Sequence, residues 1–359
     1  MPADVEAVVV DDSRFMRTMI GDILEEAGVE VVAEAADGAA GVERVVEHAP
    51  DVVTMDVEMP GTDGLTAVER IMDERPTPVL MLSAHTGEGT DTAFEALERG
   101  AVDVFAKPGG EVSAGMSRQR DQLVEKVVSV ARSDVTAASA DRPAATAGAA
   151  GTAGGGTATT TAPDAASYHD DATLVVGAST GGPQVVERVV SGLPPDADLR
   201  VLVVQHMPEG FTGRFATRLD ERSRYDVYEA DGGTVGPGEV AVAPGGRHLR
   251  AVGWRRGRLR TELTDDPPVH GCRPSVDVTM RSVAGAAAGP LVGVLLTGMG
   301  EDGAAGMRAV DAAGGHTIAQ DEETSTIFGM PREAIATGAV DRVLPAADVA
   351  AGIRDHIEL

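Results

Sequence analysis

This chain of 359 residues has a single cysteine, Cys272, and only two lysines, Lys107 and Lys126. One cysteine excludes an internal disulfide and a cysteine metal cluster, so we expect Cys272 to be a small buried or half-buried residue. Long apolar runs are also missing, and the first, Ala7 to Val10, is far too short to span a bilayer. Because the start is acidic and carries no leader pattern, we expect a cytoplasmic protein without membrane insertion.

Positive charge is scarce throughout, with 30 Lys and Arg against 57 Asp and Glu and a formal net charge of −27. Nucleic-acid binding needs a basic surface, so this balance argues against a nucleic-acid partner, and no basic helix-turn-helix pattern is present. The acidic excess is spread along the chain, which suits a surface kept hydrated in concentrated salt, where screening weakens self-repulsion. The composition predicts a halophilic protein, and an ordinary acidic protein is the alternative.

Residues 1–128 alternate short apolar segments with amphipathic ones. The segments predict strands at 6–10, 30–35, 52–55, 79–83 and 102–105, and helices at 14–27, 38–48, 64–73, 90–99 and 117–130. Apolar strands separated by helices are typical of a parallel sheet that is covered on both faces. The pattern therefore predicts an α/β domain with a five-stranded, flavodoxin-like sheet.

Polar residues follow four of these strands: Asp11 and Asp12 the first, Asp56 the third, Ser83 the fourth and Lys107 the fifth. Because the carboxyl ends of parallel strands meet at one edge, we expect these side chains to converge. Three converging carboxylates favour a hard divalent cation such as Mg²⁺. Asp56 could then attack a phosphoryl group, with Lys107 neutralising charge and Ser83 sensing the result. Each acid taken alone is more often a loop or N-cap residue.

This segment resembles the receiver domain of two-component response regulators. The matching residues are Asp11-Asp12, Asp56-Val57-Glu58-Met59-Pro60, Asp63-Gly64, Ser83-Ala84 and Lys107-Pro108. The resemblance implies that Asp56 is the phosphoacceptor and that a CheA-like histidine kinase is the donor. The Mg²⁺ ligands that it implies are Asp11, Asp12, Asp56 and the Val57 backbone, and the switch residues that it implies are Ser83 and Lys107.

Residues 129–170 separate two regions of regular pattern. They are rich in Ala, Thr, Gly and Ser and show neither helical nor strand periodicity. Such a segment cannot bury enough apolar area to offset the entropy lost on ordering. We therefore interpret it as a flexible linker that keeps two domains near each other while allowing them to separate.

Residues 171–359 again alternate strands and helices. Strands are predicted at 173–176, 199–204, 240–243, 291–296 and 316–319, and residues 247–261 read as a β-hairpin. The segment therefore predicts a doubly wound α/β domain that contains a hairpin. The hairpin arginines are interpreted as a solvated face, with a binding patch as the alternative.

The turn around Ser179 follows the first of these strands, in the run Gly177-Ala178-Ser179-Thr180-Gly181-Gly182. Flanking glycines permit a tight turn, and the helix start beyond it offers unpaired N–H groups. The spacing satisfies G-x-S-x-G, a pattern typical of a serine nucleophile. A phosphate-binding turn or a plain connection fits the hexapeptide equally well, so a base and an acid must be found elsewhere.

Two other strand ends supply these groups. His206 follows the strand at 199–204 and could accept the serine proton, whereas Asp302 follows the strand at 291–296 and could orient that imidazole. The backbone N–H groups of Thr180 and Met299 could face an oxyanion. The alternatives are a packed histidine for His206 and an N-cap for Asp302. The order Ser, His, Asp differs from that of α/β-hydrolases, so the pattern does not imply their fold.

This second region resembles the catalytic domain of the chemotaxis methylesterase family CheB, the protein-glutamate methylesterases and glutaminases. The matching stretches are Gly177 to Gly182, Gln205 to Pro208, Ala243 to His248, Arg273 to Asp277, Leu296 to Gly303 and Phe328 to Glu333. The resemblance implies that Ser179 is the nucleophile, His206 the general acid and base, and Asp302 the orienting acid. It further implies that Arg273, Ser275 and Asp277 line the substrate cleft.

The same resemblance implies a substrate and a mode of control. The substrate is the γ-methyl ester of glutamate on methylated chemoreceptors, whose methyl group leaves as methanol in a hydrolysis that needs no cofactor. Receptor glutamines are expected to be deamidated by the same residues. The unphosphorylated receiver is expected to cover the Ser179 cleft. Two other functions remain open: a receiver-coupled hydrolase of small esters, and a non-catalytic scaffold that docks signalling partners.

Overall fold

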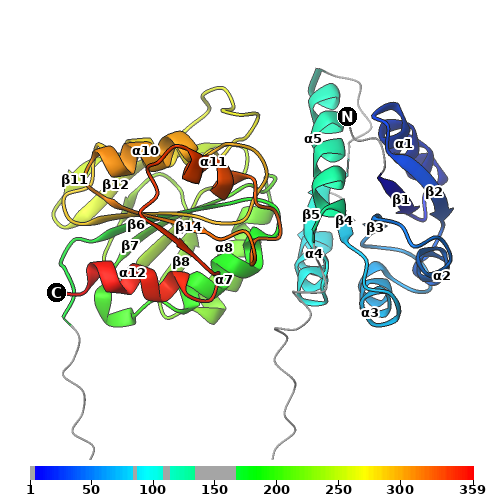
Figure 1. The fold of residues 1–359 in the computed structure, drawn as a ribbon, viewed down its shortest axis with the longest axis horizontal. Coiled ribbons are helices and arrows are strands. Elements are labelled where there is room, and N and C mark those ends of the chain that lie inside the picture. Colours follow the sequence, from blue (N-terminus) through cyan, green and yellow to red (C-terminus); the bar gives the residue numbers. More distant parts are fainter. Residues whose placement is uncertain (1–4, 84–86, 108–113, 134–166) are drawn as a thin grey trace, which may run out of the picture.

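The computed structural model describes residues 5–83, 87–107, 114–133 and 167–359 of the chain. These residues form two α/β domains (Figure 1). Ala84, Pro108 and most of the predicted linker, residues 134–166, lie outside the described residues. None of the helices in the described part is long and apolar enough to cross a membrane.

The first domain has a parallel sheet in the order β2-β1-β3-β4-β5, which confirms the predicted five-stranded sheet. Helices α1, α2 and α3 each begin at a side-chain N-cap, supplied by Ser13, Asp37 and Asp63. The elements are β1 (Glu6–Val10), α1 (Arg14–Glu26), β2 (Glu30–Ala35), α2 (Gly38–His48), β3 (Val52–Asp56), α3 (Gly64–Glu74), β4 (Val79–Ser83), α4 (Gly87–Glu98), β5 (Asp103–Ala106) and α5 (Ala114–Ala131).

The second domain has a seven-stranded parallel sheet in the order β15-β14-β13-β6-β7-β10-β8 and a small sheet in the order β11-β12-β9. Its strands are β6 (Thr173–Ala178), β7 (Arg200–Gln205), β8 (Asp226–Glu229), β9 (Thr234–Val235), β10 (Glu239–Val242), β11 (His248–Arg255), β12 (Arg258–Thr264), β13 (Leu291–Leu295), β14 (His316–Gln320) and β15 (Arg342–Leu344). Its helices are α7 (Gly182–Ser191), η1 (Pro195–Ala197), α8 (Phe211–Arg222), α9 (Val276–Ala284), α10 (Ala304–Ala312), α11 (Met330–Ala336) and α12 (Val349–Ile357).

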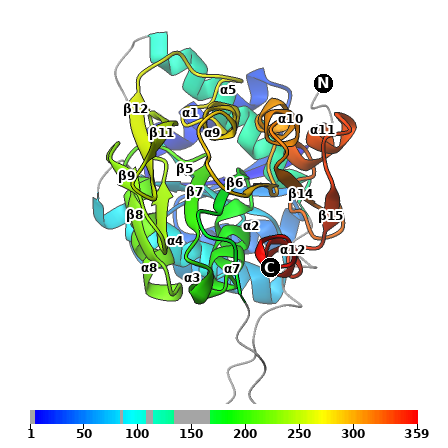
Figure 2. The same ribbon diagram turned by 90° about the vertical axis from the view of Figure 1, so that its left-hand side faces the viewer.

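Helices cover both faces of the large sheet, as a doubly wound fold requires. Figure 2 shows α9, α10 and α11 on one face and α7, α8 and α12 on the other. The central strands β6, β7 and β13 are buried along their whole length, which explains their continuous apolar runs. β11 and β12 form the predicted hairpin, with an antiparallel register that pairs Arg255 with Arg258.

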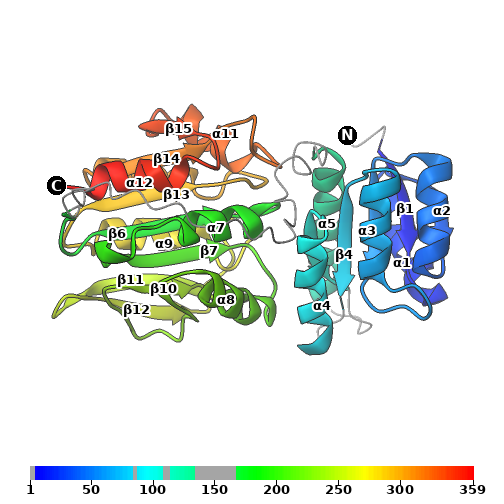
Figure 3. The same ribbon diagram turned by 90° about the horizontal axis from the view of Figure 1, so that it is seen from below.

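The two domains meet through α4 and α5 of the first domain, which face the second domain in Figures 1 and 3. Phe94 on α4 packs against Phe211 and Phe215 on α8, with ring centroids 6.4 and 6.1 Å apart. Beside these rings, Arg218 on α8 pairs with Glu98 at 2.8 Å. The contact is thus an apolar centre with a charged edge.

Candidate active site

The polar residues predicted in the second domain lie where its central strands end. β6 and β13 are neighbours in the sheet, but the helices that follow them, α7 and α10, cover opposite faces (Figure 2). Such a switch point leaves a crevice outside the carboxyl ends of the strands. Ser179 follows β6, Asp302 follows β13, and His206 follows β7 on the other side of β6. The topology therefore brings all three loops to one edge.

A backbone hydrogen bond and close packing hold the Ser179 turn in place. Its N–H donates to the Thr297 carbonyl at 3.0 Å, and the side chain is almost buried, at 6% exposure. Gly181 adopts φ 75°, and a Cβ there would lie 2.4 Å from Thr326, so this position requires glycine. Helix α7 then begins at once, with Pro183 in its first turn.

His206 and Asp302 form a direct pair. His206 Nε2 lies 2.8 Å from Asp302 Oδ2, and both side chains are nearly buried. Because Asp302 engages Nε2, the nitrogen left for another partner is Nδ1. The half-buried Cys272 side chain lies within hydrogen-bonding reach of the same ring.

These neighbours control the protonation of His206. Burial lowers the pKa of the imidazole, but Cys272 and Asp302 together raise that pKa to about 10. The pKa of Asp302 is lowered even though burial opposes this, because its carboxylate accepts hydrogen bonds from His206, Ser275 and Asp277. Both shifts favour an imidazolium paired with a carboxylate.

The carboxylate of Asp302 has all of its acceptor positions filled. It receives hydrogen bonds from His206 Nε2 at 2.8 Å, Ser275 Oγ at 2.7 Å, the Val276 N–H at 2.7 Å and the Asp277 N–H at 3.0 Å. Two of these donors belong to the first turn of α9, where the helix dipole also favours a negative charge. The acid is therefore fixed in position.

A group of possible metal ligands lies behind this acid, where His270, Asp277 and Asp302 approach within 4.8 Å of one another. Asp277 Oδ1 already accepts from the Gly303 and Gly306 N–H groups at 3.0 and 2.6 Å, and its Oδ2 faces His270. With the Asp302 oxygens also engaged, we assign no metal to this group.

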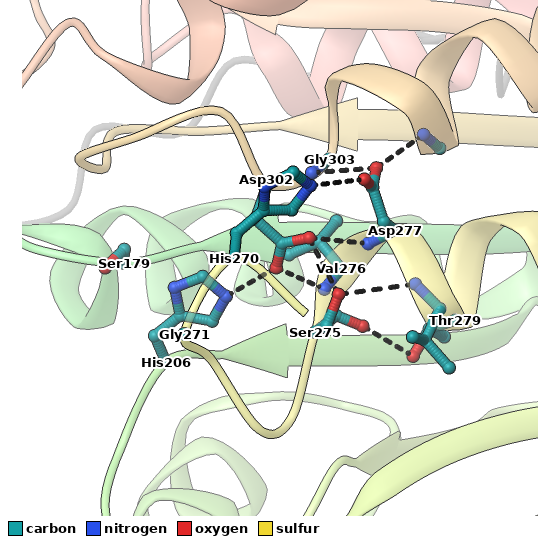
Figure 4. A network of polar contacts seen from close by, with 12 residues as sticks. Ser179, His206, His270, Gly271, Ser275, Val276, Asp277, Thr279, Asp302 and Gly303 are labelled. Atoms are coloured by element: carbon teal, nitrogen blue, oxygen red, sulfur yellow. Dashed lines mark hydrogen bonds and ion pairs between the residues drawn. The ribbon is translucent and has the colours of Figure 1, made fainter. Parts of the chain in front are cut away.

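The three residues predicted to line the substrate cleft all make contacts within the protein. Ser275 and Asp277 are 0% and 2% exposed and lie behind Asp302, so they support the acid and do not face solvent (Figure 4). Arg273 donates to the carbonyls of Asp265 and Asp266 at 3.0 and 3.2 Å. That the side chains of Arg273, Ser275 and Asp277 line the substrate cleft stays a prediction.

Ser179 and His206 extend from paired strands. Ala178 is opposite Gln205 in the register, and the His206 N–H donates to the Ala178 carbonyl at 3.0 Å. In Figure 4 both side chains lie on the same side of Asp302. Within the described residues no hydrogen bond joins the Ser179 hydroxyl to His206. The structure thus pairs His206 with Asp302. Ser179 lies beside this pair, at the end of the neighbouring strand β6.

The peptides before the two predicted oxyanion donors are held through their carbonyls. The Ser179 carbonyl accepts from Gln205 Nε2 at 2.7 Å and from the Gly182 N–H at 2.8 Å. The Gly298 carbonyl accepts from the N–H groups of Gly329 and Met330 at 3.0 and 2.8 Å. These bonds fix the peptide planes that carry the N–H groups of Thr180 and Met299.

The first domain gathers its predicted residues at the carboxyl edge of its sheet. Lys107 Nζ lies 2.8 Å from Asp11 Oδ2 and 2.7 Å from Asp56 Oδ2. Burial raises the pKa of Asp56, with Lys107 opposing the rise. Burial lowers the pKa of Lys107, but the carboxylates of Asp11 and Asp56 together outweigh it and raise that pKa. Ser83 is buried at the end of the neighbouring β4, and the Val57 carbonyl accepts from the Gly64 N–H at 3.2 Å.

Helix α5 of this domain reaches the Ser179 turn. Lys126 forms an ion pair with Asp103 and also lies 3.3 Å from the Thr180 hydroxyl. Gln122 donates to the Gly271 carbonyl at 3.3 Å, on the loop that carries Cys272. The domain contact therefore touches both sides of the candidate active site.

Comparisons with known proteins agree with this architecture. The family described as CheB methylesterase matches residues 174–353, and the family described as response regulator receiver domain matches residues 7–113. A "Protein-glutamate methylesterase/protein-glutamine glutaminase" of Haloarcula marismortui is 57% identical over 364 residues, covering 99% of this chain and 99% of the relative. The chain belongs to the CheB methylesterase family. It is a receiver-linked member, and its relatives include haloarchaeal proteins, in agreement with its acidic composition.

Further comparisons match either the whole chain or one of its domains. A protein of the same name from Natronomonas pharaonis is 57% identical over 98% of each chain. Among solved structures, the CheB methylesterase catalytic domain of Thermotoga maritima is 40% identical, covering 51% of this chain and 97% of that chain with a TM-score of 0.49. The response regulator domain of Thermotoga maritima CheB is 41% identical over 36% of this chain and 98% of that chain, with a TM-score of 0.33.

Sequence reasoning missed three contributors to the site in this CheB-family chain. Gln205 stands beside the predicted His206, yet only the fold shows that its amide reaches the Ser179 carbonyl. Cys272 precedes a matched stretch, and Lys126 is one of only two lysines. The rarity of cysteine and lysine was the one available signal for the last two.

Proposed function

We propose that Ser179, His206 and Asp302 together hydrolyse glutamate γ-methyl esters on methylated chemoreceptors. Ser179 attacks the ester carbonyl while His206 takes its proton, and Asp302 holds the imidazole and stabilises its charge. His206 then returns the proton to the departing methanol, and water resolves the acyl-enzyme by the same steps. A receptor glutamine offers the same carbonyl with ammonia as the leaving group.

One observation carries this proposal, namely the contact of 2.8 Å between His206 and Asp302 at the strand end beside Ser179. A histidine that only filled space would not need a carboxylate with every acceptor position occupied. Family membership supports the same roles, because the matched region spans all three residues. The N–H groups of Thr180 and Met299 are proposed to bind the oxyanion.

The arrangement with the domains in contact is proposed to be the resting form. The raised pKa of His206 favours the imidazolium, which cannot accept a proton from Ser179. Helix α5 reaches Thr180 beside the nucleophile and restricts access. Phosphorylation of the receiver would loosen this contact, expose Ser179 and free His206 for catalysis.

Asp56 is proposed as the phosphoacceptor, with a CheA-like histidine kinase as the donor. Ligand oxygens of Asp11, Asp12 and Asp56 lie within 4.8 Å of one another, a donor set that suits Mg²⁺, and the Val57 backbone would complete it. Bound Mg²⁺ would neutralise charge on the transferring phosphoryl group. Lys107 forms an ion pair with Asp56. Ser83 lies at the end of the neighbouring strand β4, where it would respond to phosphorylation of Asp56.

Residues 1–128 are proposed as the receiver and residues 171–359 as the catalytic domain, with 129–170 as a linker between them. Helix α5 continues to Ala131, and the Leu359 N–H donates to the Ser167 carbonyl at 2.8 Å, so regular structure extends slightly into both linker ends. Because the proposed substrate is the cytoplasmic part of a receptor, we assign the enzyme to the cytoplasm.

The discriminating experiment compares two substrates at high salt with a phosphodonor present. Methylated receptor in membranes should release methanol far faster than a small methyl ester at the same ester concentration. A preference for the small ester would favour the receiver-coupled hydrolase of small esters instead. Restoration of chemotactic swimming by Ser179→Ala would favour the scaffold.

A further inference from the structure

Gln205 contacts the proposed oxyanion site from the inside of the fold. Its Nε2 donates to the Ser179 carbonyl at 2.7 Å, together with the Gly182 N–H at 2.8 Å. In a planar trans peptide the C=O and N–H bonds point in opposite directions. The Thr180 N–H belongs to the same peptide, so it points away from these inner donors.

We propose that Gln205 is a positioning residue for ester hydrolysis. By holding the Ser179 carbonyl inward, it directs the Thr180 N–H toward the substrate oxygen. The inference rests on the proposed roles of Ser179 and Thr180.

The packing around Gln205 is costly for a residue that only fills space. The side chain is fully buried, and its Oε1 has no hydrogen-bond partner among the described residues. A Cβ on Gly182 would lie 2.2 Å from that oxygen, so a glycine is needed to admit the amide. A methionine or leucine would fill the same space without burying an unpaired oxygen. The donor that reaches Ser179 is what distinguishes glutamine from them.

The second proposed oxyanion donor is held in the same way. The Gly298 carbonyl is bound by the N–H groups of Gly329 and Met330, so the Met299 N–H is also directed by the carbonyl of its own peptide. Those holding groups are backbone atoms. Among the described residues, Gln205 is the one side chain that donates to either of these carbonyls. Substitution of Gln205 can therefore test whether holding the Ser179 carbonyl matters for catalysis.

The first variant is Gln205→Met, which keeps the side-chain length and removes the donor. Loss of an entire oxyanion donor lowers kcat by about 10²- to 10³-fold. Because the Gly182 N–H still holds the Ser179 carbonyl, we expect kcat to fall about tenfold to a hundredfold, with KM within about twofold. The assay is methanol release from methylated receptor membranes by the full chain with acetyl phosphate.

The second variant, Gln205→Glu, has a readout that packing alone would not move. A protonated carboxyl can donate to the Ser179 carbonyl, whereas a carboxylate cannot and repels it. The ratio of its kcat to that of the unmodified enzyme should therefore rise as pH falls from about 8 to about 5, since burial raises the pKa of a carboxyl. The same ratio for Gln205→Met should stay constant across this range.

Thr317→Val is the matched control, because it removes a buried hydroxyl that donates to the Ala339 carbonyl at 2.7 Å on β14, away from the site. It should lower Tm and leave kcat unchanged.

Ser179→Ala is measured in parallel. If Ser179→Ala is inactive while Gln205→Met has unchanged kcat, or only a higher KM, the role of Gln205 is overturned. If Ser179→Ala stays active, the proposed function itself fails. Should Gln205→Met not fold, a ratio for Gln205→Glu that is constant with pH overturns the inference.

Discussion

At the scale of single residues, His206 is held by Asp302 through Nε2. Asp302 engages Nε2, the nitrogen that faces the serine in the familiar Ser-His-Asp arrangement, so the proposed proton transfer from Ser179 would use Nδ1. Cys272 contacts the same ring and competes for that role.

Replacing Cys272 with alanine should shift the pH dependence of catalysis. Cys272 raises the pKa of His206, so its removal lowers that pKa, and the neutral base then persists to lower pH. The acidic limb of the pH profile of kcat/KM should move to lower pH in Cys272→Ala. The measurement is methanol release across a pH series with phosphodonor. An unchanged or upward-shifted limb would show that the thiol does not tune His206.

The convergence of Ser179, His206 and Asp302 could be predicted because all three lie in loops that follow apolar strands, and parallel strands end at one edge. Gln205 and Cys272 could not, since their roles depend on side-chain contacts between segments far apart in sequence. The contacts of Ser275 and Asp277 with Asp302 could not be predicted either, because a motif does not reveal which side chains at the start of α9 are buried.

At the scale of elements, α9 and α10 build the acidic side of the site. Ser275 caps α9 and also donates to Asp302, while Asp277 accepts from the first turn of α10. The two helix starts therefore hold the Asp302 loop between them. Among the strands, β8, β9 and β15 were not predicted, because these short edge strands are partly exposed and lack an apolar run.

Asp277→Ala should weaken this junction. It leaves the buried N–H groups of Gly303 and Gly306 without their acceptor, so the free energy of unfolding should fall by about 2 kcal/mol. The catalytic rate should fall as well, because the Asp302 loop loses its anchor. Urea unfolding followed by circular dichroism gives the first value. Asp355→Ala, an exposed partner of Arg342, is the control and should change neither quantity. Equal stability of the two variants would contradict the account.

At the scale of the whole molecule, the two domains of this acidic chain dock through a small apolar contact. Phe94 is 5% exposed and packs against two rings of α8, whereas the ion pairs around it are partly exposed and screened by salt. In concentrated salt the apolar contact should therefore dominate the docking. The two-domain organisation could be predicted from composition, but this contact could not, because it joins surfaces that local patterns do not relate.

Phe94→Ala should loosen the resting form. A loss of about 1.4 kcal/mol in docking corresponds to about a tenfold rise in the open population, so methanol release without phosphodonor should rise about tenfold. Phe15→Ala is the matched control, since Phe15 is 68% exposed on α1. A basal rate in Phe94→Ala no higher than in Phe15→Ala would argue against control through the α4–α8 contact.

The most direct test of the central claim is methanol release from methylated receptor membranes in molar KCl, with and without a phosphodonor, for the unmodified chain and Ser179→Ala. The account predicts a low basal rate that the phosphodonor raises in the unmodified chain, and no release from Ser179→Ala in either condition. Equal release by the two proteins would contradict the account.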